Sequence, residues 1–511
     1  MHVARIRSRR KTTTWFLLIK YGSIVLAIVW GIIMVPLYLR FIPIDVYGAW
    51  LASGNILAWL STMDPGLTSV LQQRIAVAYG KHDLQDVRAV LGGGLLIGAV
   101  VLLLAIIFGL ACAHYLPSWI NLSPSVDKLM IVNAFSLAVI GTSLMIFSFA
   151  ITSINQGLQG SLGSGLISIG INAISLPVTV VLLYNNFGLF ALAYNLIFAG
   201  VCSVVFQSVY LMWRVGSEKI GISFTLGSVF ALAKLLSFTL LARVSGIISN
   251  NVDLIVVSRF IGPEAITVLA LTRKSADFSK ELVNQPTSAF LPAVSHLSGA
   301  GETDKAREVL MRLVRILLWL LGMIVGGLIA FNDDFVKLWV GPQFFAGNTI
   351  NLIICGTILF TLASSCLANL CYALGNIKGS SLAGAVQSLL FIPLVIYGTK
   401  YFGLIGTVIA PLIAVFAVSA WYFPRSFSSL LKLSQRDIKG IISEVFRTVV
   451  VMVLLMLLFS WLYPKNWLQF FSFAASYCFL YAGFMHFVSG SFRDEIKGAF
   501  TGLLNKIRGY V

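Results

Sequence analysis

The sequence predicts an all-α protein that crosses a membrane about 14 times. Hydrophobic residues occupy 58% of the 511 positions and charged residues only 11%, against roughly 25% in soluble proteins. Apolar runs long enough for a helix to cross about 30 Å of hydrocarbon recur along the whole chain. A β-barrel would instead show short segments of alternating polarity. The expected class is therefore a polytopic helical membrane protein.

Fourteen apolar runs are interpreted as membrane-spanning helices. The first follows a basic N-terminus and is too long for the apolar part of a signal peptide. Turn signals such as Gly262-Pro263 bound many of the runs. The predicted spans cover residues 15–39, 46–73, 90–116, 128–152, 160–184, 187–213, 229–258, 262–295, 309–330, 347–374, 379–400, 403–424, 445–463 and 467–489.

The distribution of positive charge predicts the orientation of these helices. The formal net charge is +17, and 24 of the 36 Lys and Arg residues fall in the two termini and in alternate loops, against 6 in the other loops. Cytoplasmic segments of membrane proteins carry this excess, so both termini are predicted to be cytoplasmic. We see no basic patch interleaved with exposed aromatic residues, and therefore expect no nucleic-acid partner.

An internal repeat relates two halves of the chain. At an offset of 219 residues, Arg40-Phe41-Ile42 aligns with Arg259-Phe260-Ile261, and at an offset of 215, Phe187-Gly188-Leu189 aligns with Phe402-Gly403-Leu404. The first offset covers six predicted helices, so the halves share one orientation, and such repeats place a substrate site between lobes that rock to give alternating access. The predicted divisions are an N-terminal lobe (1–214), a C-terminal lobe (215–424) and a final segment with two more helices (425–511).

Two smaller patterns concern packing and the membrane surface. Gly94-x-x-x-Gly98 and Gly322-x-x-x-Gly326 predict close helix contacts, because glycine lets neighbouring helices approach. Residues 425–444 mix Leu and Ile with basic residues, which suits an amphipathic helix on the cytoplasmic face. Helices 1, 2, 7 and 8 hold most of the embedded polar residues and are predicted to line the central cleft.

The stretch from Ser228 to Leu297 concentrates charge in an otherwise apolar sequence. One charge at the bilayer centre costs about 2.5–3.5 kcal/mol on insertion scales, so these side chains are expected to face protein or a water-filled cavity. In the span 262–295, i, i+4 and i+3 spacing places several of them on one helix face. Either this face lines a cavity or it forms a self-neutralised ladder that only specifies packing. The predicted substrate-binding cations are Arg243, Arg273, Lys274, Lys280, Lys234 and Lys20.

A second group of charges is predicted to couple or gate transport, with a structural alternative for each. Asp64 precedes Pro65-Gly66 and either caps a helix break or binds a coupling cation. Lys20 and Lys234 lie close enough to the cytoplasmic surface to snorkel as well as to line a cavity. Arg40 and Arg259 either anchor the periplasmic ends of their helices or act in gating. The predicted coupling or gating residues are Asp64, Asp253, Asp277, Glu281, Arg40 and Arg259.

No metal or cofactor site is expected. The six cysteines lie in apolar runs without a Cys-x-x-Cys pair, and the five histidines have no ligand spacing. No phosphate-binding loop of the Gly-x-x-x-x-Gly-Lys-Ser/Thr type occurs, which argues against ATP hydrolysis by this chain.

The chain resembles a transporter family in several of these segments. The relevant residues are Asp64-Pro65-Gly66-Leu67, the run Val252-Asp253-Leu254-Ile255, the run from Ser258 to Ala265, and the polar turn from Gly299 to Arg307. They are similar to the polysaccharide-transporter branch of the multidrug/oligosaccharidyl-lipid/polysaccharide exporter superfamily, which includes O-antigen flippases. Val268 and Leu269 stand where that family often has a tyrosine.

The resemblance implies a flippase of the bacterial inner membrane. Its substrate would be an undecaprenyl-pyrophosphate-linked oligosaccharide, such as an O-antigen or exopolysaccharide repeat unit, and other polysaccharide-assembly proteins and membrane lipids would be its partners. One alternative is a drug or cation antiporter of the same superfamily, but the embedded charge here is mainly basic and favours an anion. The other alternative is a membrane-embedded glycan polymerase or transferase, for which no large loop or paired-carboxylate site is visible. An enzyme is therefore not expected.

We predict that the loops around Arg40, Lys128, Lys337 and Lys465 are periplasmic and that residues 425–444 are cytoplasmic, because the loops that carry most Lys and Arg stay inside. Single cysteines placed in each loop of a cysteine-free chain should react with an impermeant thiol reagent only in the first group. Labelling of the 425–444 segment from outside would reverse the orientation.

Overall fold

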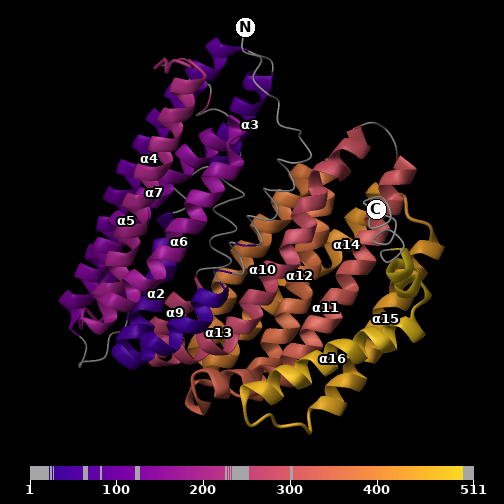
Figure 1. Ribbon diagram of the computed structural model, residues 1–511. Coiled ribbons are helices and arrows are strands. Elements are labelled where there is room, and N and C mark those ends of the chain that lie inside the picture. Colours follow the sequence, from indigo (N-terminus) through magenta and orange to yellow (C-terminus); the bar gives the residue numbers. More distant parts are fainter. Residues whose placement is uncertain are drawn as a thin grey trace, which may run out of the picture. The chain divides into compact units, whose positions relative to one another are not determined.

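The computed structural model describes residues 22, 26, 28–60, 67–80, 83–120, 127–224, 227, 229–230, 232, 252–299 and 303–498. Every regular element in this part is a helix, which confirms the predicted all-α class. Nine of the described helices are long and apolar enough to cross a membrane. The elements, seen in Figure 1, are a helix Ile28–Phe41, α2 (Ile44–Leu60), α3 (Leu67–Gly80), α4 (Leu84–Trp119), α5 (Lys128–Gly157), α6 (Ser161–Tyr184), α7 (Phe190–Ser217), α9 (Asp253–Phe260), α10 (Pro263–Gly299), α11 (Thr303–Trp339), η2 (Pro342–Phe344), α12 (Asn348–Ala373), α13 (Ile377–Ala417), α14 (Ser419–Leu430), α15 (Gln435–Phe459) and α16 (Trp467–Val488).

Polar residues in the connections fix where several helices begin. A side-chain oxygen of the residue before the helix accepts a hydrogen bond from a backbone N–H of the first turn, which otherwise lacks a partner. Ser434 and Asp437 form a reciprocal capping box at the start of α15. The other side chains that cap in this way are Asp83 before α4, Asp127 before α5, Asn376 before α13 and Asn466 before α16.

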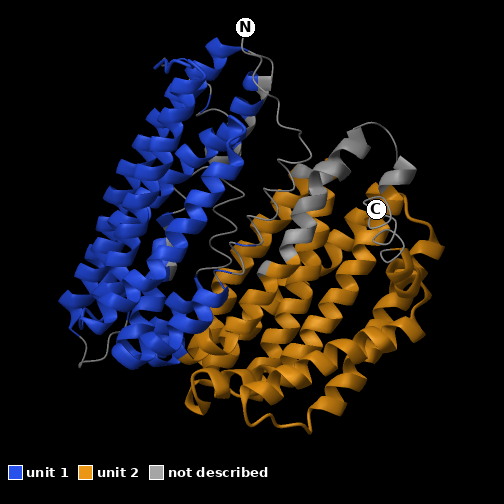
Figure 2. Ribbon diagram, in the orientation of Figure 1, with its two compact units in different colours: residues 1–267 blue, residues 268–511 orange. Residues whose placement is uncertain are grey.

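The chain divides into two compact units, residues 1–267 and 268–511 (Figure 2). In the first unit, Leu71, Leu91 and Ile154 belong to one fully buried core formed by α3, α4 and α5. Gln207 of α7 adds a polar hub, because its amide bonds Asn155 of α5 and Ser164 of α6. The predicted divisions at residues 214 and 424 stay predictions.

In the second unit, α11 packs against α15 and α16 through small residues facing large ones. Added Cβ atoms at Gly322 and Gly326 would lie 2.7 Å and 2.2 Å from the hydroxyls of Tyr481 and Tyr477. Both tyrosines are fully buried. The glycine pattern of α11 therefore marks close packing, as the sequence predicts; the α4 pattern does so too, since an added Cβ at Gly94 would lie 2.6 Å from the side chain of Leu71.

The helix ends follow the predicted repeat. The helix Ile28–Phe41 ends 219 residues before the end of α9, and α2 begins 219 residues before α10. The same offset separates the end of α3 from that of α10, and the start of α4 from that of α11. Sequence similarity at 40–42 and 259–261 therefore reflects a repeated helix-break-helix element in each unit.

The second echo marks two left-handed turns. Gly188 has φ +52° and Gly403 has φ +59°, a backbone conformation that glycine adopts without a Cβ clash. At Gly403 the chain folds back on itself, because Oγ1 atoms of Thr399 and Thr407 lie 2.9 Å apart, whereas residues eight apart in a straight helix are separated by about 12 Å. The continuous range of α13 thus contains two antiparallel helices, which match the predicted spans 379–400 and 403–424 up to Ala417.

Two boundaries differ from the sequence prediction. Residues 425–444 do not form one amphipathic helix; they divide between the end of α14 and the start of α15, with Lys432 at φ +48° in the turn. The capping box at Ser434 starts a new helix there. Also, α10 and α11 extend beyond the predicted spans 262–295 and 309–330, because polar turns can continue a helix past its apolar part.

The close approach within α13 gives a stability prediction. An alanine Cβ at Gly406 would lie 1.9 Å from the carbonyl oxygen of Gly398, whereas a Cβ at Gly384 would meet nothing within 4 Å. We expect Gly406→Ala to lower the melting temperature by several degrees in detergent, since backbone cannot yield as a flexible side chain can. Gly384→Ala is the matched control and should melt like the parent protein. Equal melting of both variants would show that the hairpin is not closely packed.

Candidate functional site

The charges of α10 form a short ladder on one helix face. Arg273 Nε lies 3.4 Å from Asp277 Oδ2, and Lys280 Nζ lies 3.3 Å from Asp277 Oδ1. The three side chains are 22%, 40% and 32% exposed for Arg273, Asp277 and Lys280. The predicted shared face is confirmed, and one carboxylate between two cations leaves a net positive charge.

Lys274 points in a different direction from the ladder. Its Nζ lies 5.4 Å from the ring centroid of Phe278, a distance at which a cation is attracted to the aromatic face. Successive residues of a helix are turned by about 100°, so a residue next to Arg273 leaves the ladder face. Lys274 therefore adds a second, half-buried positive charge beside the ladder.

The opposite face of α10 carries neutral polar groups that bind α11. Ser275 donates its hydroxyl hydrogen to Asn332 Oδ1, and Asn332 Nδ2 donates to the carbonyl of Thr272 at 2.9 Å and to Asn351 Oδ1 at 2.8 Å. Thr272 in turn donates to the carbonyl of Phe344 and accepts from the amide of Ala346. Thr272, Asn332 and Asn351 are buried, so this network ties α10, α11, η2 and α12 together.

The two faces of α10 explain how charge is tolerated in this unit. Ser275 and Ser279 point toward α11, where they line a cavity of about 250 Å³ together with Phe331 and Tyr477. Arg273 and Lys280 lie on the other side of the helix and stay partly exposed. The ladder is therefore directed away from the core of its own unit and is available to a solute or a solvated surface.

The remaining described charges lie at helix ends. Arg40 and Arg259 are exposed near the ends of the helix Ile28–Phe41 and of α9, and the Arg40 guanidinium lies 5.8 Å from the ring centroid of Phe41. Asp253 is buried at the first residue of α9, where Oδ1 accepts the amide hydrogen of Leu254. These contacts suit anchoring and capping; gating stays a prediction.

Several predicted site residues lie outside the described residues: Lys20, Asp64, Lys234 and Arg243, together with the side chain of Glu281. The structure therefore brings together Arg273, Asp277 and Lys280, and places Lys274 next to them. The predicted lining of a cleft by helices 1, 2, 7 and 8 stays a prediction.

The sequence analysis missed a buried carboxylate, Glu444. Its side chain is 4% exposed and forms an ion pair with Arg447 at 2.9 Å. Trp319 Nε1 and Ser489 Oγ donate hydrogen bonds to its Oε2 at 3.2 Å and 2.8 Å. Glu444 was assigned to a loop because the predicted span began at residue 445. The i, i+3 spacing to Arg447 and the adjoining apolar run were the available signal.

The described residues show no cluster of three or more His, Cys, Asp or Glu side chains arranged to hold a metal ion. The six cysteines are free thiols, five of them buried or half-buried. The arrangement offers electrostatic binding of an anion rather than group-transfer chemistry.

Comparison with known proteins defines the fold. Residues 95–346 match the family model described as polysaccharide biosynthesis protein. The lipid II flippase MurJ in an inward closed conformation is similar with a TM-score of 0.70 at 16% identity, over 94% of this chain and 99% of that one. An inward-facing multidrug transporter of the MOP superfamily gives 0.65 at 13% identity, over 81% and 95%. A MOP superfamily transporter from Pyrococcus furiosus gives 0.54 at 14% identity, over 83% and 95%.

A search of curated protein sequences finds no significant match. The structural matches cover nearly the full length of the known proteins, which is the evidence for the common fold. The predicted resemblance is confirmed: this multi-pass membrane protein has the fold of the multidrug/oligosaccharidyl-lipid/polysaccharide exporter superfamily, and its residues 95–346 carry the sequence pattern of polysaccharide biosynthesis proteins.

Proposed function

We propose that the chain is a flippase that moves an undecaprenyl-pyrophosphate-linked oligosaccharide across the bacterial inner membrane. The observation that carries this proposal is the α10 ladder, where Arg273 and Lys280 share one carboxylate and remain partly exposed in a largely apolar protein. The polysaccharide family match and the fold similarity to a lipid II flippase support a lipid-linked glycan as the substrate.

The chemistry of the substrate requires such a ladder. An isolated ion transferred into hydrocarbon costs tens of kcal/mol, so a pyrophosphate needs cations along its path. Arginine binds phosphate oxygens in a bidentate manner, and lysine adds a mobile point charge. Asp277 holds both cations in place when no substrate is bound, and the phosphate then competes with this carboxylate. The polyprenyl chain stays in lipid while the charged head group moves.

A drug or cation antiporter is the second candidate, because multidrug transporters share the fold. A cationic substrate would use Asp277 as its counter-ion, with Arg273 and Lys280 repelling it. The two functions therefore predict opposite effects for the same residues. The family match and the absence of a metal cluster among described residues offer no support for a polymerase or transferase.

We expect the double variant Arg273→Ala/Lys280→Ala to lower surface-glycan complementation of a flippase-null strain at least about tenfold, since each charged hydrogen bond contributes about 1.5–3 kcal/mol. Lys465→Ala, an exposed charge in the connection before α16, is the control for lost charge and should complement fully. Membrane abundance is compared by immunoblot. Full complementation by the double variant would refute the anion path. Loss of drug resistance in Asp277→Asn instead would favour the antiporter.

Arg243 gives an independent prediction from the sequence. We expect Arg243→Lys to retain partial transport, because the charge is kept, and Arg243→Ala to abolish it with normal membrane insertion. The same complementation assay measures both. If Arg243→Ala complements fully, Arg243 does not contribute to the anion path.

A further inference from the structure

A cavity of about 660 Å³ lies within the second unit, in the volume range of ligand pockets. It is formed by α11, α12, α14 and α15, and neither the ladder nor its neighbours line it. Its walls are almost entirely aliphatic and aromatic. The lining includes Val314, Leu317, Leu318, Leu321, Ala363, Cys366, Leu367, Leu370, Leu433, Ile438, Ile441, Ile442 and Val445, with Arg425, Ser428 and Ser429 as the polar members.

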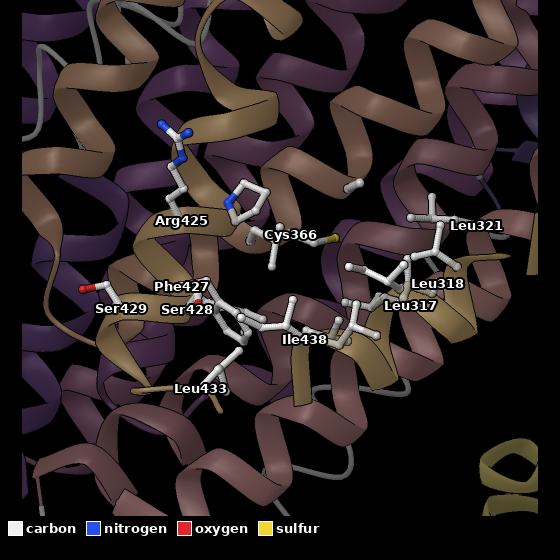
Figure 3. A pocket seen from close by; sticks show the side chains of 18 residues that line it. Leu317, Leu318, Leu321, Cys366, Arg425, Phe427, Ser428, Ser429, Leu433 and Ile438 are labelled. Atoms are coloured by element: carbon white, nitrogen blue, oxygen red, sulfur yellow. The ribbon is translucent and has the colours of Figure 1, made fainter. Parts of the chain in front are cut away.

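The pocket has a polar end and an apolar end. In Figure 3, Arg425 and Ser429 lie on one side of the cavity, and Leu317, Leu318 and Leu321 lie on the other. The lining residues of α11 run from Val314 to Leu321, seven residues that span about 10 Å along the helix axis. A ligand that fills this pocket therefore has a long apolar part and one polar end.

The surroundings of the polar end are positively charged. The segment 425–444 carries four cations and two carboxylates. Both carboxylates already have cationic partners, Asp437 with Arg307 and Glu444 with Arg447. Arg425 is exposed, with its guanidinium 5.5 Å from the ring centroid of Trp421, so it is held near the mouth of the pocket. The polar end thus complements an anion.

We propose that this pocket binds an anionic phospholipid, with one acyl chain between α11, α12 and α15 and the phosphate at Arg425 and Ser429. An aliphatic cavity of this size next to a bilayer gains dispersion contacts when a chain fills it. Basic segments on the cytoplasmic side attract anionic lipids by about 1 kcal/mol per Lys or Arg. The lipid would be a resident of the membrane rather than the transported molecule, so this site stands apart from the proposed function.

The test is native mass spectrometry of the full chain in detergent micelles that contain equal amounts of phosphatidylglycerol and phosphatidylcholine. The parent protein should retain one phosphatidylglycerol with about tenfold preference. Arg425→Gln should reduce this preference to near unity, since it removes the charge and keeps the apolar walls. Ala363→Trp, which fills the cavity, should lose both lipids. Lys378→Gln removes an exposed cation outside the lining and should behave like the parent.

Three results would overturn the proposal. Ala363→Trp protein that elutes as a monodisperse peak and still retains phosphatidylglycerol would place the lipid elsewhere. Equal losses in Arg425→Gln and Lys378→Gln would mean that surface charge alone attracts it. Displacement of phosphatidylglycerol by undecaprenyl phosphate at equal concentration would assign the pocket to the tail of a polyprenyl substrate. Because Arg425→Gln alters an exposed side chain, it decides the phosphate contact even if Ala363→Trp fails to fold.

Discussion

Polar groups inside a membrane protein need partners, because neither water nor lipid supplies them there. Both units meet this constraint with amide or carboxylate hubs. Gln207 bonds side chains of α5 and α6 in the first unit, and Asn332 bonds α10 and α12 in the second. Each hub joins at least three helices, and its geometry fixes how they are rotated about their axes. The apolar residues around the hubs then fill space at positions that hydrogen bonds have already set.

The orientation of α10 follows from this constraint. Thr272 and Ser275 must face α11 to bond Asn332, and this rotation directs Arg273 and Lys280 to the opposite side. A charged face so fixed has little freedom to turn into lipid. Buried neutral polar groups thus position exposed charged ones one or two residues away. An anion that binds the ladder meets cations whose direction is set before it arrives, which lowers the cost of ordering them.

Composition and periodicity predict the fold class because the membrane leaves few choices of structure. The repeat predicts the break between Phe41 and Ile44 and that between Phe260 and Pro263, because each requires the same local residues. Asn332 and Glu444 could not be assigned in this way, since a polar residue in an apolar run identifies no partner by itself. Glu444 finds Trp319, which is 125 residues away in the chain. The division of residues 425–444 depends on Ser434 and Asp437, whose capping pattern was present in the sequence but was outweighed by the mixed apolar and basic composition.

The two helices beyond the repeat use the same kind of anchor. Glu444, Thr448, Val451 and Leu455 form one buried stripe of α15, and Glu444 joins this stripe to Trp319 of α11 and to Ser489 after α16. The other side of α15 carries Ile438, Ile442 and Val445, which line the apolar pocket. The ion pairs Arg307–Asp437 and Arg312–Glu495 add two further links from α11, one to the start of α15 and one to the segment after α16. Removing Glu444 would leave Arg447 without its carboxylate and Trp319 without an acceptor, so one wall of the pocket would lose its fixed rotation. The buried carboxylate is therefore a structural requirement of the pocket, whatever lipid occupies it.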